Sequence, residues 1–502
     1  MTRILAIDQS TSATKALLFD ETGRCLDKES REHRQHYPQP GWVEHDAEEI
    51  WQNTITVVGG LLGRNPAAIR DLLCLSITNQ RETIVVFERG TGRPLFPAIV
   101  WQCRRGDAIC AAHAEEGREE LIHERTGLKL DAYFSGSKLQ WLVSNHPGLK
   151  AKLASGEALI GTIDAYLIYR LTGGKVFATD ATNASRTLLY DIGRLRWDEE
   201  LGELWQVPLA ALPEVRDCSA KFGETTFNGL LERPLTICGV MGDSQASLFA
   251  QRCFEPGMAK ATFGTGSSVL LNIGPKLRFS ECGVVTSLAW LHDGAPTYAF
   301  EGIIISSAAT LTWLRDQLGL VRDVPEIEAL AREVSDSEGV YLVPAFSGLG
   351  LPYWHPTARA AIVGLSGHSD RRHVARAALE SMAYQLKDAL EVMRAEADVP
   401  LLSLHGDGGP TTNTLLMQFT SDLTGAKLRV ATMADCSALG AAMAGMLGLK
   451  IFRSISELSA LPRSEIIYQP AMPPVRVQRL YAGWQSAVRQ VMPQPAPVGA
   501  VT

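Results

Sequence analysis

The first segment whose residue types could do chemistry begins at Asp8 and ends at Lys15, with Thr11 and Ser12 between them. Hydroxyl groups and exposed turn amides can hold phosphate oxygens, and a lysine ammonium can neutralise their charge. Asp8 could hold Mg²⁺ directly or through water, because Mg²⁺ prefers carboxylate and phosphate oxygens. The same residues also suit a plain turn, so this segment alone leaves both interpretations open.

Two later segments offer similar chemistry. Residues 264–267, which include Thr265, combine glycines that let a backbone approach a ligand closely with hydroxyl donors. Residues 406–413 contain Gly409 and end at Asn413, and a strand, glycines and a capped helix start suit a nucleotide contact. Each segment also fits a tight turn. Paired with the first segment, residues 264–267 predict a two-sided phosphate clamp.

Asp243 follows an apolar run and is followed by Ser244 and Gln245. A carboxylate at the end of a buried strand is costly unless it is paired or used. One interpretation is a general base that takes the proton from an attacking hydroxyl. The other is a helix N-cap formed by Asp243 or Ser244. The residues alone do not separate these two roles.

A further set of polar and aromatic residues suits a small polyol. Arg81 and Glu82 can together donate hydrogen bonds to hydroxyl groups and accept hydrogen bonds from them. Trp101, together with Tyr133, offers a flat apolar wall for the carbon atoms of such a ligand. Taken singly, each of these residues also fits a surface ion pair or a core aromatic.

The elements that must position these groups are short strands. Residues 4–7 and 16–19 predict a hairpin around the first segment, and residues 259–263 and 269–273 predict a second hairpin of the same design. One hairpin opens each half of the chain. This repetition indicates two related domains whose hairpin tips face a common cleft.

The boundary between the two domains is expected near residues 249–257, where Glu-Pro-Gly interrupts the pattern. The predicted domains are residues 1–252, which carry the substrate and phosphate segments, and residues 253–502, which bind nucleotide. A chain of 502 residues is long enough for two separate cores.

Other segments complete an α/β pattern. Residues 75–78, 235–240 and 401–404 predict strands that end in polar clusters, and residues 372–395 have helical spacing of apolar residues. In open α/β sheets, ligands gather where the strands end. The Gly- and Ala-rich residues 438–449 are too few to span a bilayer and predict a buried helix.

Composition narrows the function classes. The formal net charge is -7, which argues against nucleic-acid binding. The start of the chain lacks the apolar region of an export signal, so a cytoplasmic protein without membrane insertion is expected. The nine cysteines form no CxxC pair, and His33, His36 and His45 are expected at the surface, so neither group predicts a metal site.

Several longer stretches make the chain similar to known enzymes. It resembles the glycerol kinases, which are FGGY carbohydrate kinases, nearly from end to end. The stretches that carry this resemblance are PGWVEHD at residues 40–46, ITNQRET at 77–83, IVWQCRR at 99–105, YFSGSK at 133–138, TNASRT at 182–187, VPAFSGLGLPYW at 343–354 and LMQFTSDLTG at 416–425. Residues 360–380 resemble the second signature of the family.

The resemblance implies two actin-like (ribonuclease H-like) domains that close on MgATP and a polyol, in a homodimer or homotetramer. Transferred to this sequence, the general base falls on Asp243, and the metal contacts fall on Asp8 and Asp243. The remaining expected contacts are Arg81, Glu82, Trp101, Tyr133, Ser244 and Ser268 for the substrate, and Thr11, Ser12, Lys15, Thr265, Gly409 and Asn413 for the nucleotide.

Three positions depart from the pattern of the glycerol kinases. Ser244 replaces a Gln that contacts substrate in the family, Ser268 replaces a Phe that packs on the glycerol carbons, and Ser10 replaces a Gly in the first phosphate loop. The first two changes replace large side chains with small polar ones. They predict a larger and more hydrated pocket.

The expected reaction is phosphoryl transfer from ATP to a primary hydroxyl, with glycerol giving glycerol 3-phosphate as the leading assignment. A four- or five-carbon polyol or ketose, such as erythritol, a pentitol or a ketopentose, is the alternative that Ser244 and Ser268 motivate. A non-catalytic actin-like sensor of nucleotide or sugar is a second alternative, which the retained Asp8 and Asp243 argue against.

Overall fold

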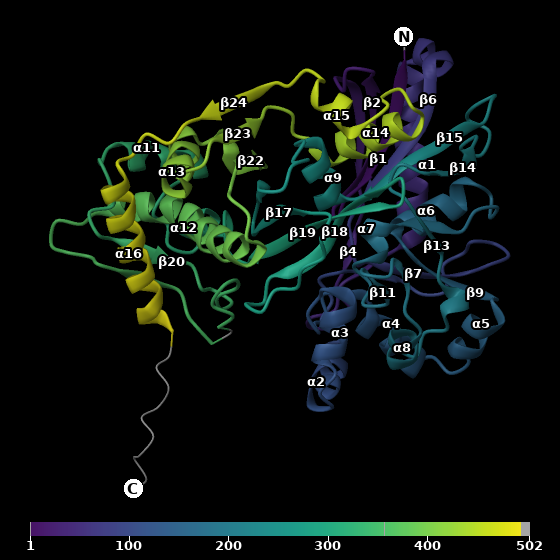
Figure 1. Ribbon diagram of the computed structural model, residues 1–502, viewed down its shortest axis with the longest axis horizontal. Helices are drawn as coiled ribbons and strands as arrows, with labels where there is room; N and C mark the ends of the chain where they lie inside the picture. Colours follow the sequence, from purple (N-terminus) through teal and green to yellow (C-terminus); the bar gives the residue numbers. More distant parts are fainter. Residues whose placement is uncertain (1, 356, 493–502) are drawn as a thin grey trace, which may run out of the picture.

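The computed structural model describes residues 2–355 and 357–492, and Figure 1 shows them arranged around two large sheets. The first sheet has six strands in the order β14-β15-β6-β1-β2-β3, and the second has seven in the order β18-β19-β17-β16-β22-β23-β24. The strands of the first sheet are β1 (Arg3–Gln9), β2 (Ala13–Asp20), β3 (Cys25–Glu32), β6 (Leu72–Asn79), β14 (Lys221–Thr225) and β15 (Leu235–Gly242).

The second sheet belongs to the later half of the chain. Its strands are β16 (Met258–Phe263), β17 (Ser267–Gly274), β18 (Val285–His292), β19 (Ala295–Ile304), β22 (Ser403–Asp407), β23 (Leu428–Ala431) and β24 (Glu465–Tyr468). The last ten residues of the predicted second domain, 493–502, lie outside the described residues. The predicted strand at 401–404 begins later, at Ser403.

Both predicted hairpins are present, and they take equivalent places in the two sheets. Strands β1 and β2 pair antiparallel, and β1 also pairs with β6, which runs parallel to it. In the second half, β16 pairs antiparallel with β17 and parallel with β22. The two halves thus repeat one arrangement, a hairpin beside a parallel strand.

Parallel pairing aligns the ends of three strands in the first sheet. Gln9 at the end of β1 pairs with Asn79 at the end of β6, and Asn79 pairs with Gly242 at the end of β15. The segments that follow these strands therefore leave the sheet at one edge. At this edge lie the segment from Asp8 to Lys15, which is predicted to bind phosphate, the pair Arg81 and Glu82, and Asp243.

A smaller five-stranded sheet, in the order β4-β5-β8-β7-β9, branches from the first half. With nearby helices it forms the lower right part of Figure 1 and carries Trp101 and Tyr133. Its elements are β4 (Gln35–His36), β5 (Glu44–His45), β7 (Ile84–Glu88), β8 (Ala98–Ile99), β9 (Ala158–Thr162), α2 (Asp107–Glu115), α3 (Glu119–Thr126), α4 (Ser135–Asn145) and α5 (Leu149–Ser155).

Two long helices cover the large sheets. Helix α1 (Ala47–Arg64) begins at the N-cap Asp46, whose side chain accepts the Glu48 N–H, and its apolar residues at helical spacing face the first core. Helix α12 (Arg371–Ala397) lies over the second sheet and confirms the helix predicted at residues 372–395. Remaining helices of the second half are α10 (Ala309–Asp316), α11 (Val324–Arg332), α13 (Thr414–Thr424), α15 (Ile455–Ser459) and α16 (Pro474–Val491).

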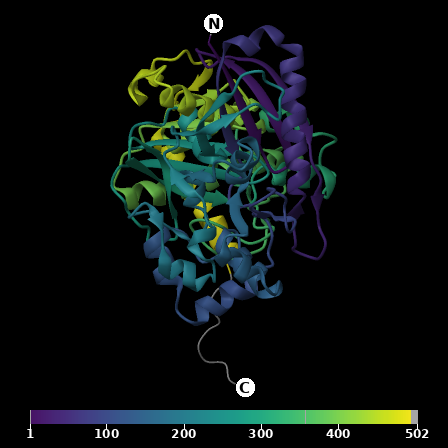
Figure 2. The same cartoon turned by 90° about the vertical axis from the view of Figure 1, so that its right-hand side faces the viewer.

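Helix α14 (Cys436–Gly448) is the predicted buried helix, and it joins the two halves. It lies between β23 and β24 of the second sheet in sequence but packs on α9 (Asp243–Ala250) and on β15, β6 and β1. Figures 1 and 2 both show this yellow-green helix beside the purple strands of the first half. A Cβ atom on Gly440 would lie 1.8 Å from the Ala246 carbonyl oxygen, and one on Gly448 would lie 1.9 Å from the Ser219 carbonyl oxygen. Only glycine permits this close approach.

Two of the three histidines expected at the surface are buried. His45 is fully buried and His33 nearly so, whereas His36 is exposed. The rings of His33 and His45 meet edge to face with centroids 4.6 Å apart. Burial lowers the pKa of His45 to about 3, so this ring is neutral and acts as part of the core.

Within the described part of the chain, no helix combines the length and apolar composition that crossing a membrane requires.

Candidate active site

The tips of the two hairpins are held in tight turns. At the first tip, the Ser10 N–H donates to the Ala13 carbonyl at 2.9 Å. Between these residues lie Thr11, which is half-buried, and Ser12, which is exposed. At the second tip, the Gly264 N–H donates to the Gly266 carbonyl at 2.9 Å and leaves Thr265 exposed. Both tips thus present hydroxyl groups and turn amides of the kind that bind phosphate.

Lys15 joins the first hairpin to the second half of the chain. Its Nζ lies 3.3 Å from Asp8 Oδ2 and 3.2 Å from Asp435 Oδ1, and Lys28 contacts the other oxygen of Asp435 at 3.0 Å. Asp435 precedes α14, so this ion pair spans the contact between the two halves. Sequence reasoning missed Asp435, because no motif marks a single aspartate before a small-residue helix.

Asp8 interacts with two further carboxylates, those of Asp243 and Asp435. Burial raises the pKa of Asp8, Lys15 opposes the shift, and the negative charges of Asp243 and Asp435 add to it. The three acids are therefore close enough to repel one another. A divalent cation would relieve this repulsion, and oxygen ligands of this kind suit Mg²⁺. The donor set fits the metal expected at Asp8 and Asp243.

Asp243 is the first residue of α9, and its N-cap is Gly242, without a side-chain cap. Of the two interpretations left open for this segment, the N-cap formed by Asp243 or Ser244 is therefore wrong. Asp243 Oδ1 accepts the Ser244 N–H at 2.6 Å and lies 3.3 Å from Arg81 Nε. The side chain is 39% exposed, which leaves room for contact with a ligand. This placement is compatible with a general base held by an arginine.

Arg81 and Glu82 belong to a buried ionic network with Arg186 and Glu301, here called the arginine–glutamate quartet. Glu301 on β19 lies between the two arginines, 2.8 Å from Arg81 Nη2 and 2.6 Å from Arg186 Nη1. Arg186 Nε also contacts Glu82 at 2.6 Å. Two positive and two negative charges therefore balance within the quartet, which is what burial of charge requires.

The two acids of the quartet differ in their surroundings. Burial by itself raises the pKa of Glu301, but Arg186 and Arg81 outweigh this effect and lower the pKa to about 2. Burial also raises the pKa of Glu82, and there Arg81 and Arg186 reduce the shift without reversing it. Glu301 is thus firmly ionised and anchors both arginines.

Glu82 is held in an unusual backbone conformation. Its φ is 62°, in the left-handed region that residues other than glycine rarely adopt. The Ser135 hydroxyl donates to its carbonyl at 2.9 Å, and the Thr83 N–H donates to the Arg81 carbonyl at 2.7 Å. Local strain that the surroundings maintain is a feature of functional sites.

The two predicted aromatic residues form one wall. The rings of Trp101 and Tyr133 have centroids 5.3 Å apart, and the Trp101 indole donates to Thr11 Oγ1 at 3.0 Å. The ammonium group of buried Lys138 donates to three successive carbonyls, those of Ala132, Tyr133 and Phe134. The hydrogen bond from Trp101 to Thr11 therefore links the predicted substrate wall to the first segment predicted to bind phosphate.

The other predicted residues lie on the second half or beside Asp243. Ser268 shares a face of β17 with Leu270, and Leu270 pairs with Glu301 of the quartet. Ser268 therefore lies on the face of the second sheet that carries Glu301, and it is nearer the hairpin tip than Glu301 is. Gly409 is exposed at the start of a short 3-10 helix, and Asn413 caps α13 by accepting the Leu416 N–H at 2.9 Å.

Arg186 and Glu301 are further residues of this candidate site that sequence reasoning did not single out. Arg186 lies within the TNASRT stretch but carries no motif of its own. Glu301 is a charged residue inside an otherwise apolar strand, and such a residue is costly to bury without a partner. That signal could have identified it.

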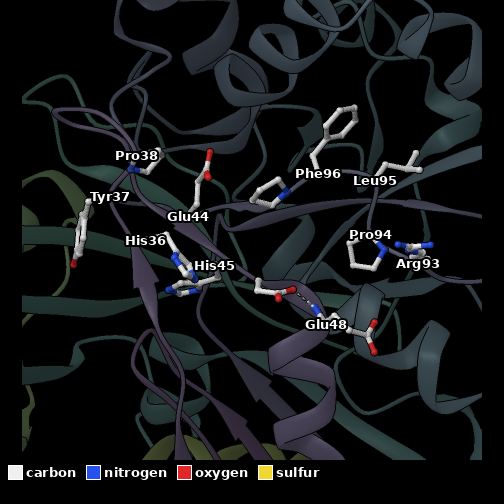
Figure 3. A pocket seen from close by; sticks show the side chains of 12 residues that line it. His36, Tyr37, Pro38, Glu44, His45, Glu48, Arg93, Pro94, Leu95 and Phe96 are labelled. Carbon is white, nitrogen blue, oxygen red and sulfur yellow. Dashed lines mark hydrogen bonds between the residues drawn. The ribbon is translucent and has the colours of Figure 1, made fainter.

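A large cavity lies away from all of these residues. It has a volume of about 1040 Å³, and Figure 3 shows Tyr37 and Pro38 at one end and Arg93 to Phe96 at the other, with Glu44 between them. None of the predicted site residues, all of which the structure describes, lines it. The predicted site residues therefore lie where the two halves meet and not in this cavity.

Comparison with known proteins covers almost the whole chain. The model of the N-terminal domain of the FGGY family of carbohydrate kinases matches residues 3–250, and that of the C-terminal domain matches residues 259–449. A glycerol kinase from Desulfitobacterium hafniense is 46% identical over 489 residues, which are 97% of this chain and 99% of that protein. One from Carboxydothermus hydrogenoformans is 45% identical over 97% of each chain.

A solved structure agrees with these matches. Plasmodium falciparum glycerol kinase with ADP superposes with a TM-score of 0.93 at 34% identity, and the alignment covers 99% of both chains.

Proposed function

Since this chain belongs to the FGGY family of carbohydrate kinases, we propose that it phosphorylates a primary hydroxyl of glycerol with ATP. The products are glycerol 3-phosphate and ADP. Membership confirms the predicted family, the α/β fold and an ATP-dependent kinase that acts on an alcohol. The observation that carries the substrate-site assignment is Asp243, held at 3.3 Å by an arginine of the buried quartet.

In the proposed reaction, Asp243 accepts the proton of the hydroxyl while its oxygen attacks the γ-phosphorus of ATP. The bond from that phosphorus to the bridging oxygen breaks, and ADP leaves with the electron pair. Arg81 and Glu82 hold the other hydroxyls, and the wall of Trp101 and Tyr133 contacts the carbons. The quartet contributes by fixing Arg81 and Glu82 before the substrate arrives.

The nucleotide is proposed to lie between the two hairpins. Thr11, Ser12 and Lys15 from the first half and Thr265 from the second would contact the phosphates. Gly409 and Asn413 would line the adenine side, because a backbone without side chains allows close approach and a helix N-terminus offers N–H donors. Closure of the two halves would exclude water and suppress hydrolysis of ATP.

Mg²⁺ is the metal that the acids around Lys15 would hold, with Asp8 and Asp243 as the contributing residues. When bound, it would neutralise charge on the phosphates and orient them. Lys15 now contacts Asp8 and Asp435, whereas Lys28 also contacts Asp435 and Arg81 contacts Asp243. ATP binding would draw Lys15 toward the phosphate oxygens.

We expect Asp8→Asn to raise the Mg²⁺ concentration for half-maximal activity by about tenfold or more, because a carboxylate ligand is lost. The measurement is activity against Mg²⁺ at saturating glycerol and ATP. Asp20→Asn, at the far end of the same hairpin and partly exposed, is the matched control and should leave the requirement unchanged. An unchanged requirement in Asp8→Asn would contradict the metal assignment.

A larger polyol or ketose is the second candidate, favoured by the small side chains at Ser244 and Ser268. Both are half-buried, and Ser268 lies on the face of the sheet that carries Glu301. A panel of glycerol, erythritol, pentitols and ketopentoses decides between them. We expect the highest kcat/KM for glycerol, and a much higher value for a longer substrate would overturn the assignment.

The expected homodimer or homotetramer and the cytoplasmic location stay predictions. A non-catalytic sensor is not supported, because the family to which the chain belongs is one of kinases.

A further inference from the structure

Two histidines and a glutamate converge on the second half of the molecule, away from the residues of the candidate active site. Glu338 Oε2 lies 3.6 Å from His368 Nε2 and 3.7 Å from His373 Nε2. One ligand atom from each side chain lies within 4.8 Å of the others. These three residues are called the His–His–Glu cluster. Among the residues that the structure describes, no other group of three metal-ligating side chains comes this close.

His373 gives the cluster its buried member. It is 1% exposed, and over the described residues its Nε2 has no hydrogen-bond partner although it faces Glu338. Its other nitrogen, Nδ1, lies 3.1 Å from Asp370 Oδ1. A histidine whose Nδ1–H donates to a carboxylate presents the lone pair of Nε2 outward, which is the usual arrangement of a metal-bound imidazole.

The turn that carries Glu338 is fixed by its backbone. Glu338 has a φ of 49° and is followed by Gly339 with a φ of 85°. The Glu338 N–H donates to Asp336 Oδ1 at 2.9 Å, and a Cβ on Gly364 would lie only 2.0 Å from the Gly339 carbonyl oxygen. The turn therefore packs tightly on the segment that leads to His368 and α12. The Glu338 carboxylate is therefore already directed at the two histidines, and no rearrangement of the loop is needed to bring it there.

We propose that the His–His–Glu cluster binds a divalent transition metal ion, with Zn²⁺ as the preferred ion. His368 Nε2, His373 Nε2 and one oxygen of Glu338 are the ligands, and water completes a tetrahedron. Two ligands that each bind Zn²⁺ at about 2.0–2.2 Å lie roughly 3.3–3.5 Å apart. The observed separations to Glu338 exceed this by a few tenths of an ångström, and the exposed His368 side chain is free to close the rest.

This site differs in chemistry from the proposed Mg²⁺ site. Imidazole nitrogens favour Zn²⁺, Co²⁺, Ni²⁺ and Cu²⁺, whereas Mg²⁺ prefers oxygen ligands only. Mg²⁺ in a kinase assay therefore does not fill the cluster. A bound ion would tie the turn at Glu338 to the first turn of α12, so it would act on stability and not on the phosphoryl transfer.

A different role for His373 must be separated from metal binding. The Asp370 backbone N–H donates to Nδ1 at 3.1 Å, within a capping box at the start of α12. While Nδ1 accepts that N–H, Nε2 carries the proton, so metal binding requires the other tautomer, in which Nδ1–H donates to Asp370 Oδ1. The test therefore uses His368, which is 74% exposed and takes no part in the capping box.

The experiment uses the untagged full-length chain, because an added histidine tag would bind the same ions. After treatment with a chelator and dialysis, Zn²⁺ binding is measured by calorimetry in the presence of excess Mg²⁺ and ADP, which occupy the oxygen site. Co²⁺ is added separately, and its visible absorption reports tetrahedral nitrogen coordination. We expect one Zn²⁺ per chain and a rise in the Tm of about 2 °C or more at saturation.

His368→Ala and Glu338→Gln should each weaken this binding by at least tenfold and remove the Tm rise and the Co²⁺ absorption. His36→Ala, which also removes an exposed histidine, is the matched control and should bind as the unaltered chain does. All three variants should retain kinase activity. Equal Zn²⁺ affinity in His368→Ala and the unaltered chain, or no Zn²⁺ binding by either, would overturn the proposal.

Discussion

Replacing Asp243 by asparagine is expected to lower kcat by roughly 10²–10⁴-fold while ATP binding changes little. Asparagine has the same shape and can keep the contact with the Ser244 N–H, but it cannot accept a proton from the attacking hydroxyl. The variant therefore separates the loss of a base from a loss of structure. Turnover is measured by ADP formation at saturating glycerol, and ATP affinity is measured by calorimetry.

Asp107→Asn is the matched control for this prediction. Asp107 is the first residue of α2 and follows the N-cap Gly106, as Asp243 is the first residue of α9 and follows Gly242. Both substitutions thus remove one carboxylate from the first turn of a short helix. Asp107→Asn should keep near-normal turnover. If Asp243→Asn did the same, another group would have to take the proton.

The second large effect is expected at Glu301. Glu301→Gln removes the anion between Arg81 and Arg186 and leaves two buried guanidinium groups with one carboxylate. Breaking a buried ion pair in this way costs about 3–5 kcal/mol of unfolding free energy. Arg81 also loses the group that positions it, so the substrate is held in a less favourable orientation. We therefore expect kcat/KM for glycerol to fall by roughly 100-fold. Urea unfolding and steady-state kinetics measure the two effects.

The pH dependence of stability gives an independent measure. Although burial raises the pKa of Glu301, the two arginines lower it to about 2 in the folded chain, against an ordinary value of 4.5. Between these values the unfolded chain binds more protons, so stability rises with pH. The contribution of Glu301 is present above about pH 4.5 and is lost as pH falls toward 2. Glu301→Gln should show a shallower loss of stability over this range.

Glu380→Gln is the control that separates stability from function. Glu380 on α12 is buried and accepts a hydrogen bond from Arg376 at 2.6 Å, in a pair that includes none of the predicted site residues. This variant should lower stability without changing the KM for glycerol. A normal KM in Glu301→Gln would show that the quartet has no part in holding the substrate.

Local signals in the sequence were sufficient for the elements that position the site. Turn residues between short apolar runs identified both hairpins, and helical spacing identified α12 within a few residues of its bounds. Resemblance to the FGGY kinases then indicated the family, which the comparisons confirm. The roles of the individual site residues stay predictions that the variants above will test.

The contacts between distant segments could not be predicted in the same way. Lys15 and Asp435 are separated by 420 residues, and Arg81 and Glu301 by 220. Pairing over such separations depends on how the two halves pack, which no local pattern records. The wrong N-cap assignment has a related cause, because the register of β15 places Gly242 and not Asp243 at the boundary of α9.

Helix α14 also ties a segment of the second half to the packing of the first. Gly440 and Gly448 bring it so close to the first half that no layer of side chains separates them. The helix therefore packs as part of that half, although in sequence it lies between β23 and β24 of the second sheet. Residues 432–435 connect β23 to the helix and end at Asp435, the carboxylate that holds Lys15. A nucleotide whose phosphates attract Lys15 would therefore weaken an ion pair that spans the contact between the two halves.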